Sequence, residues 1–427
     1  MPKPLEGIRV LDFTWLNAGA KGPRHLAAFG AEVIRIEWTE KLDFIRYGFP
    51  QHTAPGESAP PTGDRGSFDR SKVQSVNRAA GWNNTNAGKL GVSLNMHHPH
   101  GKELFREMLP LADVVTDNYT AQTLERWGFG YEEMRKVKPD IIYVQAPGFG
   151  KLGPYRDFRS YGPIAAGVSG LQFMSGLPDR ASCGYGFSYL DVGGPWFIVM
   201  AVMSALHLRA KTGRGQHIDL SQVGPGFLLT GTAILDYTAN GRHYERSGNR
   251  APYTKAAPHG VYRTQGEDNW VAIAVSTDEE WRAFCHAIGD PEWTDDPRFA
   301  SRESRYENQD ALDALVTAWT QDRERYEVMQ LLQKSGVPAG VCEDTKDRIE
   351  LDEQLIHRGY MQQVDHTEVG KYRVEGIVGR WSETQPHASG SIGWGAPCYG
   401  EHNLRVFGDL LGLGASDVGK LAEQGVI

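Results

Sequence analysis

The sequence has few cysteines, and none of them is spaced as in a disulfide framework or a zinc site. The four cysteines lie far apart and form no CxxC pair: Cys183, Cys285, Cys342 and Cys398. Such dispersed cysteines are typical of reduced thiols in a cytoplasmic protein. His97, His98 and His100 cluster in a predicted turn, but no acidic ligand or further histidine lies at metal-ligand spacing. We therefore expect cytoplasmic localisation and no bound metal.

Long apolar runs and clusters of one charge are also missing. The longest uncharged apolar stretch, Val192–Leu206, is shorter than the roughly 20 residues that a membrane span needs, and it predicts a buried helix. The polar N-terminal segment predicts no signal peptide. The net charge is −8, and Lys and Arg are scattered through the chain. We therefore expect no nucleic-acid partner and no membrane partner.

Several motifs of catalysis and nucleotide binding are absent. The sequence contains no GxSxG nucleophile elbow, no HExxH and no GxxxxGK[ST] phosphate-binding loop. The segment NAGAKG at 17–22 follows a predicted strand, and Glu37 lies eighteen residues after Gly19, as in the opening of a nucleotide-binding fold. This segment lacks the GxGxxG spacing that lets the backbone approach a pyrophosphate. A nicotinamide or flavin dehydrogenase is therefore disfavoured.

Predicted strands and helices alternate over the first half of the chain, which is typical of a parallel sheet covered on both faces. Strands are expected at 8–13, 32–37, 92–94, 112–116, 140–145 and 216–220, and helices at 22–30, 100–111, 132–138 and 192–209. After Gly241 the pattern changes to an antiparallel strand pair, 260–263 and 270–275, and three helices. The sequence thus predicts an α/β fold, with a Rossmann-like large domain and a smaller α+β domain.

The chain of 427 residues is longer than one hydrophobic core usually serves, and this length predicts two domains. We place the N-terminal part of the large domain at 1–220, a connector at 221–240, the small domain at 241–335, and a second connector with the return to the large domain at 336–427. Residues 49–89 are rich in Pro, Gly, Ser, Asn and Asp. A loop of that length predicts a subunit contact or an active-site cover.

Asp191 is the strongest candidate for a catalytic residue. It lies in the segment GFSYLDVGG at 186–194, at the start of the apolar helix, where flanking glycines permit another molecule to approach closely. A carboxylate in that position is suited to act as a nucleophile. Asp is also a preferred N-cap, and this segment taken alone favours the capping role. The choice between the two roles depends on the rest of the chain.

About ten further motifs follow one another in order along the chain. They are PLEGIRVLDF at 4–13 with Ala18-Gly19, FGAEVIRIE at 29–37, LNM at 94–96, GKEL at 101–104, ADVV at 112–115 with NY at 118–119, LERWG at 124–128, PGFG at 147–150 with GP at 153–154, RAKTGRGQ at 209–216, GVPAG at 336–340 and GEH at 400–402. Together they resemble the family III CoA-transferases, a superfamily with formyl-CoA transferase, carnitine CoA-transferase and 2-methylacyl-CoA racemase. The resemblance implies a CoA-transferase that forms a dimer of interlocked rings.

The resemblance also implies a mechanism and substrates. Asp191 would attack an acyl-CoA thioester, such as that of succinyl-CoA, and form a mixed anhydride, while the CoA thiolate stays bound. The thiolate would then give an aspartyl-CoA thioester, and an acceptor carboxylic acid would repeat the steps in reverse. Polar groups near Asn17, Gly193 and Gly194 would stabilise the developing charges.

A CoA-binding surface is implied by the same resemblance. Its predicted residues are Trp15, Leu16, Ala18, Leu94, Asn118 and Tyr119, with Arg126 and Arg159 facing the phosphates. Structural alternatives stay open for three of them. Trp15 would pack in the core, Asn118 would form a turn, and Arg126 would be a solvated helix cation.

The chain departs from some relatives of the family. Racemases and epimerases pair the aspartate with a histidine in the segment that here reads RSYG at 159–162, so the second acid/base of a two-base proton transfer is missing. The glycine-rich loop of oxalate-specific members corresponds here to 247–257, which has one glycine, a bulky Tyr253 and two cations. The pattern is closer to the benzylsuccinate-type branch, which handles succinyl-CoA and aryl- or alkyl-substituted succinates. Some members of that branch work as two related subunits. A homodimer, a heteromer with a related subunit and a non-catalytic partner subunit therefore all stay open.

Overall fold

The computed structural model divides the chain into two compact units. It describes these residues: 2–48, 50–57, 73–251 and 253–427. Unit 1 comprises Met1–Gln172, Gly184–Arg242 and Gln354–Ile427, and unit 2 comprises Phe173–Cys183 and His243–Glu353. The functional division into a CoA-binding domain and a smaller domain stays a prediction. The expected cover formed by residues 49–89 falls partly on positions 49 and 58–72, which lie outside the described residues.

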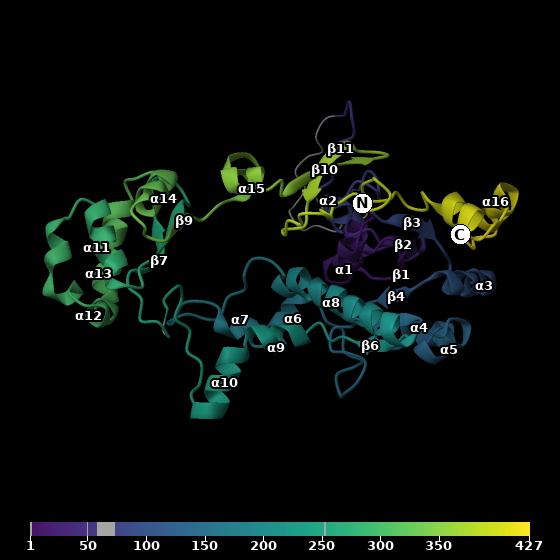
Figure 1. The fold of residues 1–427 in the computed structure, drawn as a ribbon, viewed down its shortest axis with the longest axis horizontal. Helices are drawn as coiled ribbons and strands as arrows, with labels where there is room; N and C mark the ends of the chain where they lie inside the picture. Colours follow the sequence, from purple (N-terminus) through teal and green to yellow (C-terminus); the bar gives the residue numbers. More distant parts are fainter. Residues whose placement is uncertain (1, 49, 58–72, 252) are drawn as a thin grey trace. The chain divides into compact units, whose positions relative to one another are not determined.

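A six-stranded parallel sheet forms the centre of unit 1 (Figure 1). Its strands are β1 (Arg9–Asp12), β2 (Glu32–Glu37), β3 (Leu90–Ser93), β4 (Val114–Asp117), β5 (Ile142–Gln145) and β6 (His217–Asp219). Their order across the sheet, β3-β2-β1-β4-β5-β6, is that of a doubly wound Rossmann-like fold. The predicted α/β class is confirmed.

Both faces of this sheet are covered, as the continuous apolar runs in its strands predict. Along each strand, successive residues point to opposite faces of the sheet and therefore pack in two different cores. Leu11 packs in one core with Phe105 and Leu421, and Val10 packs in the other with Leu26 and Val202. The first core is covered by α3 (Pro99–Met108) and α16 (Ala415–Glu423), and the second by α1 (Leu16–Ala28) and α8 (Tyr189–Thr212).

The helix α1 begins earlier than the sequence indicates. The glycines of the segment at 17–22 predict a turn followed by a helix from residue 22, whereas α1 already starts at Leu16. The reason is close packing. A Cβ atom on Gly22 would lie 3.0 Å from the Cβ atom of Ile198 on α8, so a glycine lets the two helices approach. Here tertiary contact outweighs the low helix propensity of glycine.

The helix α8 is longer than the predicted 192–209, and the expectation that it is a buried helix is wrong. One face packs on the sheet and on α1 through Gly194, Ile198 and Val202, while Met200 and Met203 on other faces are exposed. By length and composition alone, α8 is also apolar enough to cross a membrane. Because it starts at Tyr189, Asp191 lies within its first turn.

The remaining elements of unit 1 connect or flank the sheet (Figure 1). They include α2 (Ala80–Thr85), α4 (Thr123–Trp127), α5 (Tyr131–Val137), α6 (Gly162–Val168), α9 (Gly224–Leu229), α10 (Gly231–Asn240) and the antiparallel hairpin of β10 (Met361–His366) and β11 (Gly370–Glu375). The sequence predicts one connecting helix up to about residue 240. The structure has two, because α9 ends at Leu229 and α10 starts at Gly231.

Unit 2 contains a small antiparallel sheet with its own core. Strands β7 (His259–Arg263) and β8 (Trp270–Ala274) form the expected antiparallel pair, and β9 (Ala339–Val341) adds a third strand that the sequence did not indicate. The helices that pack on it are α11 (Asp278–Ala287), α13 (Gln309–Thr320) and α14 (Arg325–Lys334). The predicted antiparallel pair and the three helices are thus confirmed.

Candidate active site

The sheet has a topological switch point between β1 and β4. From β1 the chain proceeds outward through β2 and β3, and it then returns to the other side of β1 to form β4. In open parallel sheets, ligands bind in the crevice at the carboxyl ends of the two strands that flank such a point. The residues at these ends are Phe13–Leu16 after β1 and Asn118–Tyr119 after β4. Four of the eight residues predicted to bind CoA therefore lie at the expected edge: Trp15, Leu16, Asn118 and Tyr119.

The side-chain amide of Asn118 joins the two chain segments at this crevice. Its Oδ1 accepts a hydrogen bond from the backbone N–H of Trp15 at 2.6 Å, and its Nδ2 donates to the carbonyl of Trp15 at 3.1 Å. Gly19 leaves room for it, because a Cβ atom there would lie 2.5 Å from Asn118 Cγ. The amide of Asn118 thus fixes the backbone of Trp15, which is a structural role of the kind left open above.

Leu16 has a strained backbone at the first position of α1. Its φ angle is +56°, in the left-handed region that a leucine rarely adopts. Its N–H points at the carboxylate of Asp43, with distances of 3.0 and 3.2 Å to the two oxygens. Asp43 is fully buried and pairs with Arg35 Nη2 at 3.0 Å. Burial raises the pKa of Asp43, and the Arg35 charge opposes that shift. A buried ion pair therefore holds the conformation that starts α1.

Two pockets lie side by side at this edge and share Trp15, Lys41, Tyr119 and Thr123. We name the first, of about 320 Å³, the aromatic pocket; it is lined by Phe13, Trp15, Ile36, Glu37, Trp38, Lys41, Leu94, Met96, His97, Tyr119, Thr123, Arg126 and Trp127. We name the second, of about 460 Å³, the aspartate pocket; besides the shared residues it is lined chiefly by Leu16, Ala18, Asn118, Arg156, Arg159, Tyr161, Gly162, Asp191 and Gln222.

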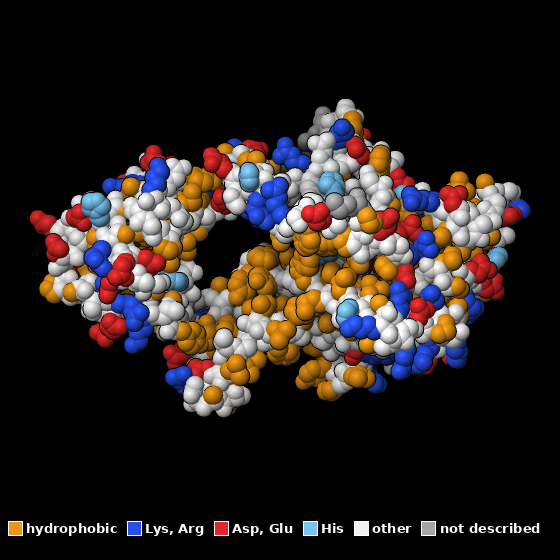
Figure 2. Space-filling model, viewed as in Figure 1, with side chains coloured by type: hydrophobic (Ala, Val, Ile, Leu, Met, Phe, Trp, Pro, Cys, Tyr) orange, Lys and Arg blue, Asp and Glu red, His pale blue; other side chains and the backbone are white. Residues whose placement is uncertain are grey.

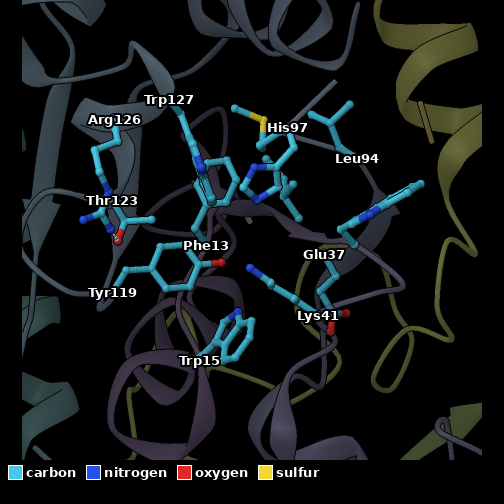
Figure 3. A pocket seen from close by; sticks show the side chains of 13 residues that line it. Phe13, Trp15, Glu37, Lys41, Leu94, His97, Tyr119, Thr123, Arg126 and Trp127 are labelled. Carbon is cyan, nitrogen blue, oxygen red and sulfur yellow. Dashed lines mark hydrogen bonds between the residues drawn. The ribbon is translucent and has the colours of Figure 1, made fainter. Parts of the chain in front are cut away.

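The aromatic pocket combines flat apolar surfaces with cations (Figure 3). The ring of Tyr119 lies 5.6 Å from that of Trp15 and 5.8 Å from that of Trp127. Lys41 points into the pocket toward Tyr119, and Arg126 Nη2 donates to Thr123 Oγ1 at 3.2 Å at its rim. Aromatic faces suit a stacked base, and exposed cations suit phosphates.

Asp191 lies in the first turn of α8 and is not its N-cap. The N-cap of α8 is Ser188, whose carbonyl accepts a hydrogen bond from the N–H of Asp191 at 3.0 Å. Asp191 lies three positions later, where a carboxylate interacts favourably with the helix dipole. Its Oδ1 accepts a hydrogen bond from Gln222 Nε2 at 2.8 Å. Burial raises the pKa of Asp191, while hydrogen bonds from Ser188 and Gln222 counteract this shift.

Gly162, the first residue of α6, lets the side chains of Ser188 and Asp191 lie against its backbone. A Cβ atom at this position would lie 2.5 Å from Ser188 Cβ and 2.7 Å from Asp191 Oδ2. The lining residues include the cations Lys41, Arg156 and Arg159, and Asp191 is the one acid among those that the structure describes there. The pocket therefore attracts anions and holds one partly buried carboxylate.

Three of the predicted catalytic residues are not among the described residues that line the two pockets. They are Asn17, Gly193 and Gly194. Gly193 and Gly194 belong to α8 beyond its first three residues, where each N–H donates to the carbonyl four residues earlier. Asn17 is the second residue of α1 and half-buried. Their charge-stabilising roles stay predictions.

The sequence profile of CoA-transferase family III matches residues 5–403. The chain belongs to this family. It is a CoA-transferase, as its motifs predict, and its substrates include an acyl-CoA.

Curated relatives of the family match over nearly their whole length. The chain is 32% identical to a succinyl-CoA–D-citramalate CoA-transferase of Chloroflexus aurantiacus, over 100% of this chain and 98% of the relative. It is 28% identical to the beta subunit of a succinyl-CoA–L-malate CoA-transferase of the same organism, over 99% and 98%. A mouse succinyl-CoA:glutarate CoA-transferase is 26% identical over 100% of this chain and 90% of its own.

Solved structures of the family agree with the fold. A CAIB/BAIF family protein from Brucella suis superposes with a TM-score of 0.82 at 28% identity, covering 96% of this chain and 100% of that one. A protein from Mycobacterium tuberculosis at 23% identity superposes with a TM-score of 0.74, over 94% of this chain and 98% of its own, and shows the fold alone.

Some residues of the site were not predicted from the sequence. Gln222 contacts Asp191, Lys41 lines both pockets, and Arg156 and Tyr161 line the aspartate pocket. Lys41 lies four residues after the end of β2, which is the one signal that the sequence offered for it. Among the described residues, no group of three or more His, Cys, Asp or Glu side chains is placed to hold a metal ion.

Proposed function

We propose that this CoA-transferase moves CoA from succinyl-CoA to a dicarboxylic acid through covalent intermediates on Asp191. The observation that carries the proposal is the position of Asp191, which lines a cationic pocket that shares four residues with the aromatic pocket. CoA has an aromatic base, phosphates and a thioester, so an aromatic and cationic pocket beside a carboxylate fits its chemistry. Three relatives named above for succinyl-CoA support the choice of donor.

The proposed transfer has four steps. Asp191 Oδ2 attacks the thioester carbon, the C–S bond breaks, and the CoA thiolate and a mixed anhydride form. The thiolate attacks Cγ of Asp191, the bond between Cγ and Oδ2 breaks, and the donor acid leaves from an aspartyl-CoA thioester. The acceptor carboxylate then attacks Cγ and expels the thiolate. Finally the thiolate attacks the acceptor's acyl carbon and restores the Asp191 carboxylate.

A dicarboxylic acceptor fits the charges of the aspartate pocket. Arg156 and Arg159 line it together with Lys41, and guanidinium groups bind carboxylates in a fork of two hydrogen bonds. Succinate derivatives with aryl or alkyl substituents belong to the same class, and Trp15 and Tyr161 give the pocket aromatic surface for them.

We further propose that the chain acts as a dimer in the cytoplasm, either with itself or with a related chain. Hydrophobic side chains gather over α6, α8 and α9 (Figure 2). They include the exposed Ile164, Met200, Phe227 and Leu228. Exposed apolar surface of this kind is typical of a subunit contact. One relative is named as a beta subunit, which supports a heteromer as one form of such a dimer.

The test is the intact mass of the protein after mixing with succinyl-CoA and a panel of other acyl-CoAs. We expect an acyl or CoA adduct in the native chain and none in Asp191→Asn. Asp322→Asn, which changes an exposed carboxylate of unit 2, is the matched control and should keep the adduct. If no donor leaves an adduct although CoA binds, covalent transfer by this chain alone is contradicted, and a partner-dependent subunit becomes the better explanation.

A further inference from the structure

Gln222 contacts the side chain of the proposed nucleophile, although no motif of the sequence marked it. It follows β6 at the carboxyl edge of the sheet, 31 residues after Asp191 along the chain. Its Nε2 donates to Asp191 Oδ1 at 2.8 Å. The residue is half-buried and lines the aspartate pocket.

The backbone around Gln222 is held firmly in place. The N–H of Gln222 donates to the carbonyl of Pro147 at 3.1 Å, and the N–H of Val223 donates to the carbonyl of Gly148 at 3.0 Å. Ser221 Oγ donates to the same Gly148 carbonyl at 3.1 Å. Three hydrogen bonds thus tie the turn after β6 to the segment after β5. A donor on such a support keeps its direction during a reaction.

The two oxygens of Asp191 have different surroundings. Oδ1 accepts a hydrogen bond from the amide of Gln222, whereas Oδ2 lies against Gly162, which also lines the aspartate pocket. Because the amide engages Oδ1, we assign Oδ2 as the oxygen that attacks the thioester. Oδ1 stays beside the amide throughout and becomes the carbonyl oxygen of the acylated aspartate.

We propose that Gln222 is a catalytic hydrogen-bond donor that stabilises the negative charge on Asp191 Oδ1 when Cγ of the acylated aspartate is attacked. This inference rests on the proposed covalent function of Asp191. When the thiolate sulfur bonds to Cγ, the electron pair of the Cγ=Oδ1 bond moves to Oδ1. It returns as the bond between Cγ and Oδ2 breaks and the donor acid leaves as its carboxylate. The attack of the acceptor carboxylate on the thioester places charge on the same oxygen.

The first step makes a different demand on the site. There the charge develops on the carbonyl oxygen of the donor thioester, and not on Asp191 Oδ1. Removing the donor of Gln222 should therefore slow attack on Cγ much more than it slows acylation. A residue that merely orients Asp191 would slow both steps together. The ratio of the two steps separates stabilisation from orientation.

The experiment is rapid mixing with succinyl-CoA, acid quench and intact-mass analysis. Gln222→Met keeps the length of the side chain and Gln222→Leu shortens it, both remove the donor, and thermal unfolding checks that each is folded. Gln216→Met is the matched control, because Gln216 precedes β6 at the opposite end of the strand. We expect both Gln222 variants to form the acyl adduct, and to convert it to the CoA adduct about 100-fold more slowly than the native chain.

The outcomes are distinct. Conversion at the native rate in a folded Gln222 variant would overturn the inference, and so would an equal loss of both steps. An adduct in the native chain alongside either result leaves the proposed function of Asp191 intact. Absence of any adduct in the native chain would instead refute the covalent function, and the inference about Gln222 with it.

Discussion

Gly162 leaves no room for a side chain next to Asp191. In Gly162→Ala, the new Cβ atom would fall 2.7 Å from Asp191 Oδ2, closer than real Cβ contacts, so the carboxylate must move. Small misplacements of a reacting group cost about 100-fold in rate. We expect kcat/KM for CoA transfer to fall by about that factor. Steady-state kinetics with succinyl-CoA would measure the loss.

The same helix provides a control for this substitution. A Cβ atom on Gly167 would meet no atom within 4 Å, and its φ angle is not positive. Gly167→Ala should therefore keep native activity and stabilise the protein by about 0.5–1 kcal/mol, because alanine is favoured over glycine inside a helix. If Gly162→Ala were as active as Gly167→Ala, the tight contact at Asp191 would not matter for the reaction.

The pH dependence of the reaction should report the raised pKa of Asp191. Burial is the largest cause of that shift, and only the ionised carboxylate is a nucleophile. Activity should therefore be low at pH values below the raised pKa and reach a plateau above it. The profile of kcat/KM reports this pKa in the free enzyme. An acidic limb near the ordinary value of 3.8 would contradict the expected shift.

Gln222→Met supplies a second check of this profile. The hydrogen bond from Gln222 lowers the pKa of Asp191, so its removal should raise the pKa further. The acidic limb should then move to higher pH in the variant. An unchanged limb would show that the amide does not interact with the carboxylate in solution.

Single residues of the site were predictable from the sequence only where a motif or a position along the chain marked them. Asp191 was singled out because it lies at the start of an apolar helix in a recognisable order of motifs, and Trp15, Asn118 and Tyr119 because they follow strands; all four line the pockets. Gln222 could not be found in that way. Its contact with Asp191 depends on how β6 and α8 pack, and no local pattern encodes a pair 31 residues apart.

At the scale of elements, the crossing of α1 and α8 depends on Gly22. In Gly22→Val the added side chain would press against Ile198, whose Cβ atom lies 3.0 Å from an ideal Cβ at Gly22. Overpacking of this kind should lower the free energy of unfolding by about 1–3 kcal/mol. The double variant Gly22→Val, Ile198→Ala should lose less stability than the sum of the losses in the two single variants, because the smaller side chain at 198 makes room for the valine. Urea unfolding of the single and double variants would measure both effects.

The double variant also tests whether the side chains at positions 22 and 198 interact. If Gly22→Val and Ile198→Ala destabilise the protein additively, the two residues do not interact. The same conclusion would follow if Gly22→Val changed the free energy of unfolding only by the difference in helix propensity between glycine and valine.

Elements buried in the sheet were predictable, and elements shaped by close contacts were not. The apolar runs of β1, β2, β4 and β5 fall within one or two residues of their predicted limits, because burial on both faces leaves an unbroken signal. The start of α1 was missed because its glycines indicate a turn. They are tolerated in a helix because Asn118 and Ile198 occupy the space that side chains would need.

For the whole molecule, the apolar surface of α8, α9 and α10 predicts association. Met200, Leu228 and Leu235 are each more than half exposed, at 63%, 70% and 67%. We expect light scattering to give the mass of a dimer. Leu235→Glu should weaken that dimer by about fivefold or more, since burying an unpaired carboxylate at a subunit contact costs over 1 kcal/mol.

The corresponding control lies in unit 2. Gln321→Glu introduces the same charge at an exposed position that follows α13, and it should leave the mass unchanged. A monomer in the native chain at micromolar concentration would contradict the expected association, unless a related second chain restores it.

The organisation into two units was predictable in outline because the pattern of strands changes after Gly241. The short segment Phe173–Cys183 belongs to unit 2 although it lies far from the rest of that unit in sequence. Arg246 makes this connection, because its guanidinium donates to the carbonyls of Phe173 and Arg180 at 3.2 and 2.9 Å. Contacts between distant segments of this kind leave no periodic signal in the sequence.

The two hydrogen bonds between the Asn118 side chain and the Trp15 backbone affect how substrates can enter the site. One side-chain amide holds both the N–H and the carbonyl of Trp15, so the segments after β1 and β4 are tied together as one edge. That edge resists being spread apart by an arriving molecule. Widening of the aspartate pocket is then easier along the exposed stretch 156–161, which also lines it. The residues proposed to contact CoA thus lie on a fixed edge, and those proposed to contact the acid lie on a segment that is freer to move.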